Sequence, residues 1–194
     1  MIIACCNIKG GVGKTTTAMA LATLASRDGK RVTVHDADPQ GTSSAWAMAA
    51  DANGDTLPFA VLPANVATIA AMRADGDRWC FVDCPPNGAV VDEAVSRADI
   101  VVIPTTPKPA DLDKTVQAAR AVRSQGKDYA ILVTMARRGT LSERAAFEML
   151  RDEGESFFEH PIYLKEIVSE TFCSAFGADL FGYENVYEEL KELA

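Results

Sequence analysis

The sequence predicts an α/β fold in which a mainly parallel, twisted sheet is flanked by helices on both faces. Short apolar runs alternate with amphipathic stretches along the chain. The apolar runs are nearly continuous, which is typical of strands that are buried on both faces of a parallel sheet. No linker rich in Pro, Ser or Gly, internal repeat or low-complexity segment interrupts this alternation. We therefore expect a single domain over residues 1–194.

The alternation begins at the first residue. Residues 1–8 (MIIACCNI) form an apolar run that predicts a buried strand, and a glycine-rich loop leads from it into an Ala-rich helix over 14–30 that ends near Gly29. A second strand is predicted over 31–38 (RVTVHDAD), followed by a short helix over 43–51. Helical crossovers of this length are expected between parallel strands.

Two further strand–helix pairs follow. Residues 59–64 predict a weak strand, and Asn65 is a good N-cap for a helix over 65–76. Residues 78–86 (RWCFVDCPP) form an apolar strand that two prolines stop, because proline cannot donate to a strand ladder. A helix over 89–98 completes this part of the chain.

The rest of the chain continues the same pattern. Asp111 near the start and Gly126 past the end mark one of its helices clearly. The predicted strands are 99–106 and 129–136, and the predicted helices are 110–126, 141–154, 163–175 and 183–193.

Composition and charge restrict the class of function. The 194 residues are 48% apolar and 24% charged, which is ordinary for a globular protein. A net charge of −8 argues against a protein coated with basic residues, although basic residues outnumber acidic ones between residues 108 and 151. The start has no basic leader, and no apolar stretch approaches the roughly 20 residues of a membrane span. We expect a cytoplasmic protein.

The cysteines are an odd number without the spacing of a zinc site. Four of them lie in predicted strands or at a strand end, so we interpret them as small core residues in a reducing compartment. A redox or metal role is the alternative. The five are Cys5, Cys6, Cys80, Cys84 and Cys173.

Residues 9–16 (KGGVGKTT) predict a phosphate-binding loop between a strand and a helix. Glycines at 10, 11 and 13 permit a tight backbone whose amides can approach an anion. Lys14 supplies a point charge for the outer phosphates, the Thr15 hydroxyl is a ligand for Mg²⁺, and Thr16 opens the helix whose N-terminal amides face the phosphates. A glycine turn without a ligand is the alternative.

The motif KGGVGKTT resembles the deviant Walker A motif of the ParA/MinD family of P-loop ATPases, and the size resembles that of small ParF-like plasmid and chromosome partition ATPases. The resemblance implies that Lys9 reaches across a nucleotide-sandwich dimer to the ATP of the partner. A lysine that touches only its own phosphates or solvent is the alternative. The implied nucleotide-binding residues of the loop are Lys9, Gly10, Gly11, Val12, Gly13, Lys14, Thr15 and Thr16, with Lys9, Lys14 and Asp38 as catalytic residues.

Asp36 and Asp38 stand at the end of the second predicted strand, two residues apart and so on one face. The stretch Asp-Ala-Asp-Pro-Gln resembles the switch I motif of the family. By that match, Asp38 positions the attacking water close to Mg²⁺, and Asp36 supports the hydration shell of the metal. Phosphoryl transfer depends mainly on positioning and charge neutralisation, which suits carboxylates beside a metal. A turn stabilised by Asp and Pro is the alternative.

Asp83 ends the strand RWCFVD and precedes two prolines. It resembles the Walker B aspartate followed by the switch II motif of the family, which implies that Asp83 holds Mg²⁺ through water. The residues implied at the metal are Thr15, Asp36, Asp38 and Asp83. An ordinary strand-terminal aspartate is the alternative.

The base pocket is expected at the end of the strand over 129–136. The resemblance places Thr134 and Met135 near the adenine, and Pro161 with Ile162 could close the pocket. Ordinary loop residues are the alternative here. No Asn-Lys-x-Asp-like element for reading guanine follows a late strand, so ATP is the expected substrate and ADP the product.

The resemblance implies a partition ATPase whose ATP-bound homodimer binds nonspecific DNA on the nucleoid, with slow Mg²⁺-dependent hydrolysis that a centromere-binding, ParB-like partner stimulates. The acidic ending predicts no membrane attachment, and a start at the first strand predicts no operator-reading region. Such DNA binding weakens steeply with salt, because basic side chains release counterions. The candidates for it are Lys108, Lys114, Arg120, Arg123, Lys127, Arg137, Arg138, Arg144, Arg151 and Lys165, and a solvated surface with ion pairs is the alternative for each.

Two other functions fit parts of the pattern. Related small ATPases position conjugative-transfer complexes, chemosensory arrays or other large assemblies with the same nucleotide switch. Related folds also include amide-forming cobyrinate and dethiobiotin synthetases, which need no counterpart of Lys9. Lys9 together with Asp-Ala-Asp-Pro-Gln argues against the synthetases.

Overall fold

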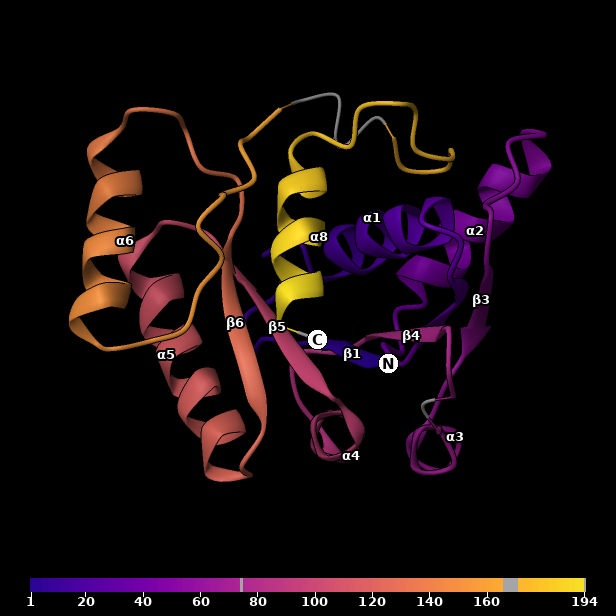
Figure 1. The fold of residues 1–194 in the computed structure, drawn as a ribbon, viewed down its shortest axis with the longest axis horizontal. Coiled ribbons are helices and arrows are strands. Elements are labelled where there is room, and N and C mark those ends of the chain that lie inside the picture. The colour runs from indigo at the N-terminus through magenta and orange to yellow at the C-terminus, as the bar shows by residue number, and fades with distance from the viewer. Residues whose placement is uncertain (74, 166–170, 194) are drawn as a thin grey trace.

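The computed structural model describes residues 1–73, 75–165 and 171–193. Six strands in this part of the chain form a sheet in the order β3-β2-β4-β1-β5-β6, and all of its strand pairs are parallel (Figure 1). The chain first passes from β1 to β2 on one side of the sheet, and later from β4 across β1 to β5 on the other side, so the direction of strand addition reverses at β1. The strands are β1 Ile2–Cys5, β2 Arg31–Asp36, β3 Ala60–Pro63, β4 Arg78–Asp83, β5 Ile100–Thr105 and β6 Asp128–Val133.

Helices cover both faces of the sheet (Figure 1). Helices α1, α2 and α8 pack into one apolar core, and α3, α4, α5 and α6 pack into the other. The helices are α1 Lys14–Arg27, α2 Thr42–Ala52, α3 Val66–Ala70, α4 Ala89–Arg97, α5 Pro109–Ser124, α6 Leu141–Asp152 and α8 Tyr183–Glu192.

The central strand β1 shows why its sequence is apolar without interruption. Ile3 and Cys5 belong to the core beneath α1, whereas Ile2 and Ala4 belong to the core beneath α4 and α5. Successive side chains of a strand point to opposite faces, and here both faces are buried. The predicted parallel sheet between two helical layers is therefore confirmed.

All six strands end earlier than the apolar runs that predicted them. Strands β1, β2 and β4 end at Cys5, Asp36 and Asp83, and the chain then turns into loops at one edge of the sheet. After β2, for example, the amide of Gly41 donates to the carbonyl of Asp38 at 2.8 Å in a tight turn. These loops gather beside β1, where a reversal of strand order leaves a crevice for ligands.

Two predicted helices need correction. The helix expected over 65–76 has the expected Asn65 cap but ends at Ala70, and the guanidinium of Arg73 donates to the carbonyls of Ala70 and Met72 at this end. Of the helix expected over 163–175, residues 166–170 lie outside the described residues. The described residues at its two ends are not helical.

The segment before residue 166 is extended because its backbone pairs with β6. The amides of Phe158 and Ile162 donate to the carbonyls of Ile131 and Val133, both at 2.9 Å. The pairing continues into the range of the predicted helix, where the amide of Leu164 donates to the carbonyl of Ala136 at 2.8 Å. Among the described residues, no helix has both the length and the apolar composition needed to cross a membrane.

Candidate functional site

The loop between β1 and α1 opens the N-terminus of α1 toward solvent. Gly11 and Gly13 have φ values of 74° and 91°, a left-handed backbone conformation that residues other than glycine adopt only with strain. Gly13 is the N-cap of α1 and, as a glycine, has no side chain to cap the helix. The free amides of the first turn can therefore bind an anion, which the helix dipole also favours.

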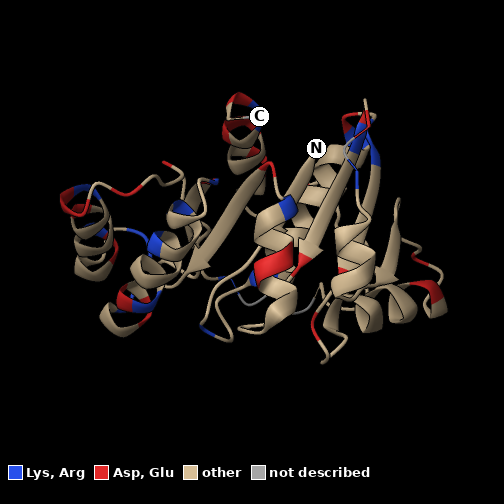
Figure 2. Cartoon of the chain, turned by 90° about the horizontal axis from the view of Figure 1, so that it is seen from below, with Lys and Arg blue, Asp and Glu red and all other residues tan. Residues whose placement is uncertain are grey.

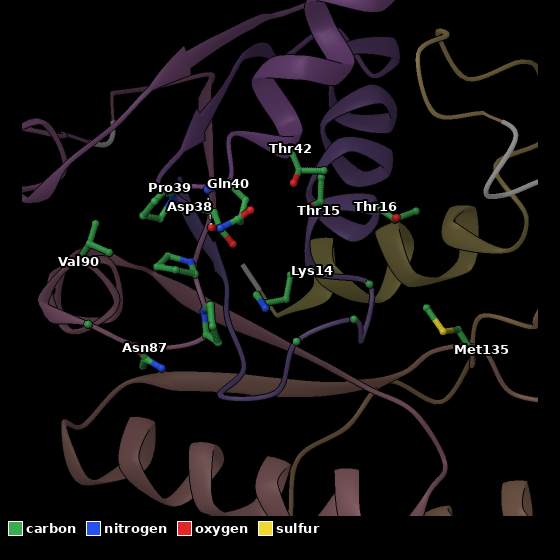
Figure 3. Close-up of a pocket in the computed structure, with 16 residues that line it drawn as sticks. Lys14, Thr15, Thr16, Asp38, Pro39, Gln40, Thr42, Asn87, Val90 and Met135 are labelled. Carbon is green, nitrogen blue, oxygen red and sulfur yellow. Dashed lines mark hydrogen bonds between the residues drawn. The ribbon is translucent and has the colours of Figure 1, made fainter.

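A cleft of about 850 Å³ lies over this loop, at the carboxyl edge of the sheet. Figure 3 shows the side chain of Lys14 in the cleft, with Asp38, Pro39 and Gln40 grouped together and Met135 at the opposite end. The lining residues come from the glycine loop and the start of α1, from residues 38–42 after β2, from residues 85–90 after β4, and from Met135 after β6.

The two lysines of the loop have different surroundings. Lys14 is buried, lines the cleft, and donates from Nζ to the carbonyl of Lys9 at 3.3 Å. The side chain of Lys9 is exposed and does not line the cleft. Its amide donates to Oδ1 of Asn7 at 3.0 Å. One lysine therefore faces the cleft of this subunit, and the other does not.

Asp36 and Asp83 form a buried floor beneath the cleft: they end two neighbouring strands in register, and neither is among the residues that line the cleft. Oδ2 of Asp83 accepts hydrogen bonds from Thr15 Oγ1 at 2.7 Å and Ser43 Oγ at 2.5 Å. Oδ2 of Asp36 accepts from the amide of Ser44 at 2.8 Å. The Oδ1 atoms of both carboxylates are buried and lack a partner in the described part of the chain.

Buried carboxylate oxygens without partners are costly unless a cation binds them. Two such oxygens, with the Thr15 hydroxyl that contacts the Asp83 carboxylate, are hard ligands of the kind that Mg²⁺ prefers, so these residues fit that ion. Within residues 1–73, 75–165 and 171–193, no group of three or more His, Cys, Asp and Glu could hold a metal ion by itself. A Mg²⁺ ion here would therefore share its coordination between Thr15, Asp36, Asp83, water and phosphate oxygens.

Asp38 lies apart from this floor. It is partly exposed on the wall of the cleft, and its Oδ1 accepts from the amide of Gln40 at 2.9 Å. Its carboxylate is thus held by the turn that follows β2, at the same side of the cleft as Lys14 (Figure 3).

Burial raises the pKa of Asp83 from 3.8 to about 6, while the hydrogen bonds from Ser43 and Thr15 lower it. A raised pKa means that the folded protein holds this proton more tightly, so its contribution to stability is present below pH 4 and is lost as the pH rises through 6. We expect Asp83→Asn to stabilise the nucleotide-free protein at pH 8 by about 3 kcal/mol, the equivalent of the pKa change. Urea unfolding at pH 8 and pH 4 measures this difference, which should vanish at pH 4.

The amide oxygen of the variant can still accept from Thr15 and Ser43, so Asp83→Ala is the matched control that loses both hydrogen bonds. A wild-type protein that is at least as stable as Asp83→Asn at pH 8 would contradict the buried, uncompensated charge.

The two residues expected at the adenine, Thr134 and Met135, have different positions: Met135 lines the cleft, and Thr134 is buried. Met135 is 40% exposed, lines the cleft, and has a left-handed φ of 53°. Thr134 is buried beneath the loop, where Oγ1 donates to the carbonyl of Val12 at 2.8 Å and lies 3.0 Å from the carbonyl of Thr105. Ile162 is buried in the core rather than exposed in the cleft.

The sequence interpretation missed Thr42, Ser43 and Asn87. Thr42 and Asn87 line the cleft, and Ser43 contacts Asp83. The signal for Thr42 and Ser43 was a pair of hydroxyl residues directly after Gly41 at a helix start. Nothing in the local pattern marks Asn87.

The basic residues between 108 and 165 lie mainly on α5, α6 and the loops beside them. In Figure 2, residues of both signs occur on the helices beside the β6 edge. Arg120, Arg123 and Lys165 pair with Glu153, Glu155 and Asp179. Those that form no ion pair with another described residue include Lys108, Lys114, Arg137 and Arg144.

The family model described as the CobQ/CobB/MinD/ParA nucleotide binding domain matches residues 3–175. The chain belongs to this family. It is an ATPase with the P-loop fold, of the ParA/MinD type expected from KGGVGKTT.

Relatives and solved structures agree with this placement. The chain is 38% identical over 165 residues to the "Maintenance of carboxysome distribution protein A" of Gloeobacter kilaueensis, covering 81% of this chain and 74% of that one. It is 29% identical over 234 aligned residues to the chromosome partitioning protein ParA of Caulobacter vibrioides, covering 94% and 87%. A putative plasmid partition protein of Borrelia burgdorferi bound to AMPPNP has the same fold, with a TM-score of 0.78 at 18% identity, over 99% and 97%.

Proposed function

We propose that this ParA/MinD-type ATPase forms an ATP-dependent sandwich dimer that binds DNA nonspecifically and segregates plasmid or chromosomal DNA. Slow, Mg²⁺-dependent hydrolysis ends the dimeric state, and a centromere-binding partner accelerates it. The γ-phosphate and Lys9 favour only the dimeric arrangement, so hydrolysis removes that preference.

The two lysines of the phosphate loop carry this proposal. Lys14 lies in the cleft of its own subunit, whereas Lys9 is exposed outside it. Two ATP–Mg²⁺ assemblies facing each other hold excess negative charge, and a lysine from each partner offsets it. An exposed Lys9 whose backbone is fixed on both sides is well placed for that role.

The hydrolytic step needs a positioned water and neutralised phosphate charge. Bound Mg²⁺ supplies part of that neutralisation. Lys14 and the open amides of α1 hold the phosphates, and the carboxylate of Asp38 on the cleft wall orients the water. Thr15, Asp36 and Asp83 anchor the metal side of the nucleotide. The proposal thus gives Asp38 a role in turnover and the floor residues a role in binding.

DNA binding by the ATP-bound dimer is expected to depend on the basic residues that have no ion pair with a described residue. A dimer presents each of them twice, which doubles the number of phosphate contacts that one duplex can make. We expect Lys114→Ala to weaken binding to duplexes of any sequence and to reduce the slope of log affinity against log salt by about two, because each lost phosphate contact contributes about 0.9. Fluorescence anisotropy between about 50 and 200 mM salt measures the slope.

The control for this experiment is Lys191→Ala, which removes a lysine of α8 that pairs with Glu188. It should bind DNA like the wild type. If ATP-bound wild-type protein does not bind duplex at low salt, the DNA part of the proposal is wrong.

A second cargo is favoured by one comparison. The 38% identity to a carboxysome distribution protein supports a variant in which the same ATP switch positions a large protein assembly. Both candidates share the ATP cycle, so they differ only in the adaptor that stimulates hydrolysis.

The cargo is tested by deleting the gene and following both outcomes in the same cells. Random plasmid or chromosome loss with normally spaced assemblies supports DNA partition. Clustered protein assemblies with normal DNA inheritance support the second candidate and contradict the first.

A further inference from the structure

A buried network of hydrogen bonds around Asn7 holds the backbone of the exposed Lys9. Asn7 is 2% exposed, and all of the hydrogen bonds of its side chain are made within the protein. Its Nδ2 donates at 2.8 Å to the carbonyl of Pro104 and at 2.8 Å to Thr115 Oγ1, and its Oδ1 accepts from the amide of Lys9. One side chain thus links the phosphate loop to the end of β5 and to α5.

The donors and acceptors of this network fix the orientation of the Asn7 amide. Because both protons of Nδ2 have acceptors on the α5 side, Oδ1 must face the loop, where it meets the amide of Lys9. Thr115 Oγ1 is itself fully buried and lies 2.8 Å from the carbonyl of Asp111, within α5. It also lies 2.8 Å from Thr105 Oγ1. Together with the carbonyl of Pro104, the hydroxyl of Thr115 therefore sets the orientation of the Asn7 amide that holds the backbone of Lys9.

Lys9 is held from its other side by the nucleotide lysine. The carbonyl of Lys9 accepts from Nζ of Lys14 at 3.3 Å, a contact that the phosphates compete for when nucleotide binds. The hydrogen bond that the Lys9 amide donates to Asn7 Oδ1 does not face that competition, because Asn7 does not line the cleft. The hydrogen bond between the Lys9 amide and Asn7 therefore still holds the backbone of Lys9 when Lys14 binds the nucleotide.

We propose that Asn7, oriented by Thr115, is a positioning residue that aims Lys9 away from its own cleft and toward the nucleotide of the second subunit. This inference rests on the proposed function. Asn7 also connects the phosphate loop to α5, the helix that carries Lys114 and other candidate DNA contacts. The residue at the dimer contact and the basic surface are thus joined through the buried side chain of Asn7.

Thr115 offers a nearly isosteric test away from the nucleotide. Thr115→Val keeps the shape but removes the hydroxyl, whereas Thr115→Ser keeps the hydroxyl and is the matched control. We expect Thr115→Val to speed hydrogen exchange of the Lys9 amide in the nucleotide-free monomer by about tenfold, the effect of losing a typical hydrogen bond. NMR of isotope-labelled protein measures this amide directly, and Thr115→Ser should resemble the wild type.

The second readout is assembly. Sedimentation with ATP should show the dimer of Thr115→Val weakened about tenfold, while its affinity for Mg²⁺–ADP as a monomer stays within about twofold of wild type. Thr115→Ser should again match the wild type. If Thr115 had a purely structural role, Thr115→Val would lower thermal stability, and it would weaken dimerisation and ADP binding to the same extent.

The outcomes separate the inference from the proposed function. If the wild type dimerises with ATP and Thr115→Val dimerises equally well, the inference is overturned and the proposed function stands. Unchanged exchange of the Lys9 amide in both Thr115→Val and Asn7→Ala also overturns it. If the wild type stays monomeric with ATP, the proposed function and the aim toward a second subunit both fail, and accelerated exchange then supports only the attachment of Lys9 to Asn7.

Discussion

Lys9→Ala is expected to remain monomeric in ATP under conditions in which the wild type dimerises. The exposed side chain contributes little to its own cleft, so nucleotide affinity of the monomer should change little. Across a dimer, the same side chain would be the partner of a buried phosphate charge. Removing such a partner weakens association by about 100-fold or more. Sedimentation with ATP, with ADP and without nucleotide measures the effect.

Two controls make this result specific. Lys14→Ala should lose nucleotide affinity in the monomer, because Lys14 is the lysine within the cleft. Lys30→Ala, after α1, should behave like the wild type. Identical monomeric profiles for the wild type in all three nucleotide conditions would contradict the sandwich dimer.

Asp38→Ala is expected to dimerise with ATP and hydrolyse it poorly. Asp38 is on the cleft wall, and its carboxylate is separate from the buried pair of Asp36 and Asp83. Its loss should leave binding intact but remove the group that orients water, so turnover should fall by about 100-fold or more, the usual contribution of such a group. Phosphate release under partner-stimulated conditions measures the rate.

Asp38→Asn is the matched variant, since its amide oxygen keeps the hydrogen bond from Gln40 but carries no charge. We expect a rate between those of the wild type and Asp38→Ala. A variant Asp38→Ala that fails to bind ATP, or that hydrolyses it at the wild-type rate, contradicts the assignment of Asp38 to the attacking water.

Much of the fold was predictable from local patterns. Apolar runs that are buried on both faces identify parallel strands, and the run in β1 has that property because Ile2 and Ile3 enter different cores. Element ends were less predictable. The helix expected over 65–76 ends at Ala70, where the side chain of Arg73 donates to the terminal carbonyl, and the extended segment near Ile162 is set by pairing with β6.

The candidate site divides in the same way. The phosphate loop and the strand-terminal carboxylates are contiguous motifs in the sequence. The chemical roles of Lys14, Thr15 and Asp83 could therefore be predicted without knowing where these residues lie in the structure. The supporting residues could not, because each meets its partner from a distant part of the chain. Thr134 contacts Val12, and Ser43 contacts Asp83, only because the strand order brings their loops together.

The sequence by itself determined the order of strands and helices, the phosphate loop and the presence of a second lysine at position 9. Local backbone geometry and side-chain periodicity are enough for these features. Only the tertiary structure decided that Lys9 lies outside the cleft and that Asn7 and Thr115 stand behind it. Parallel strands place residues more than 90 positions apart within hydrogen-bonding distance, and burial then requires each polar group among them to find a partner.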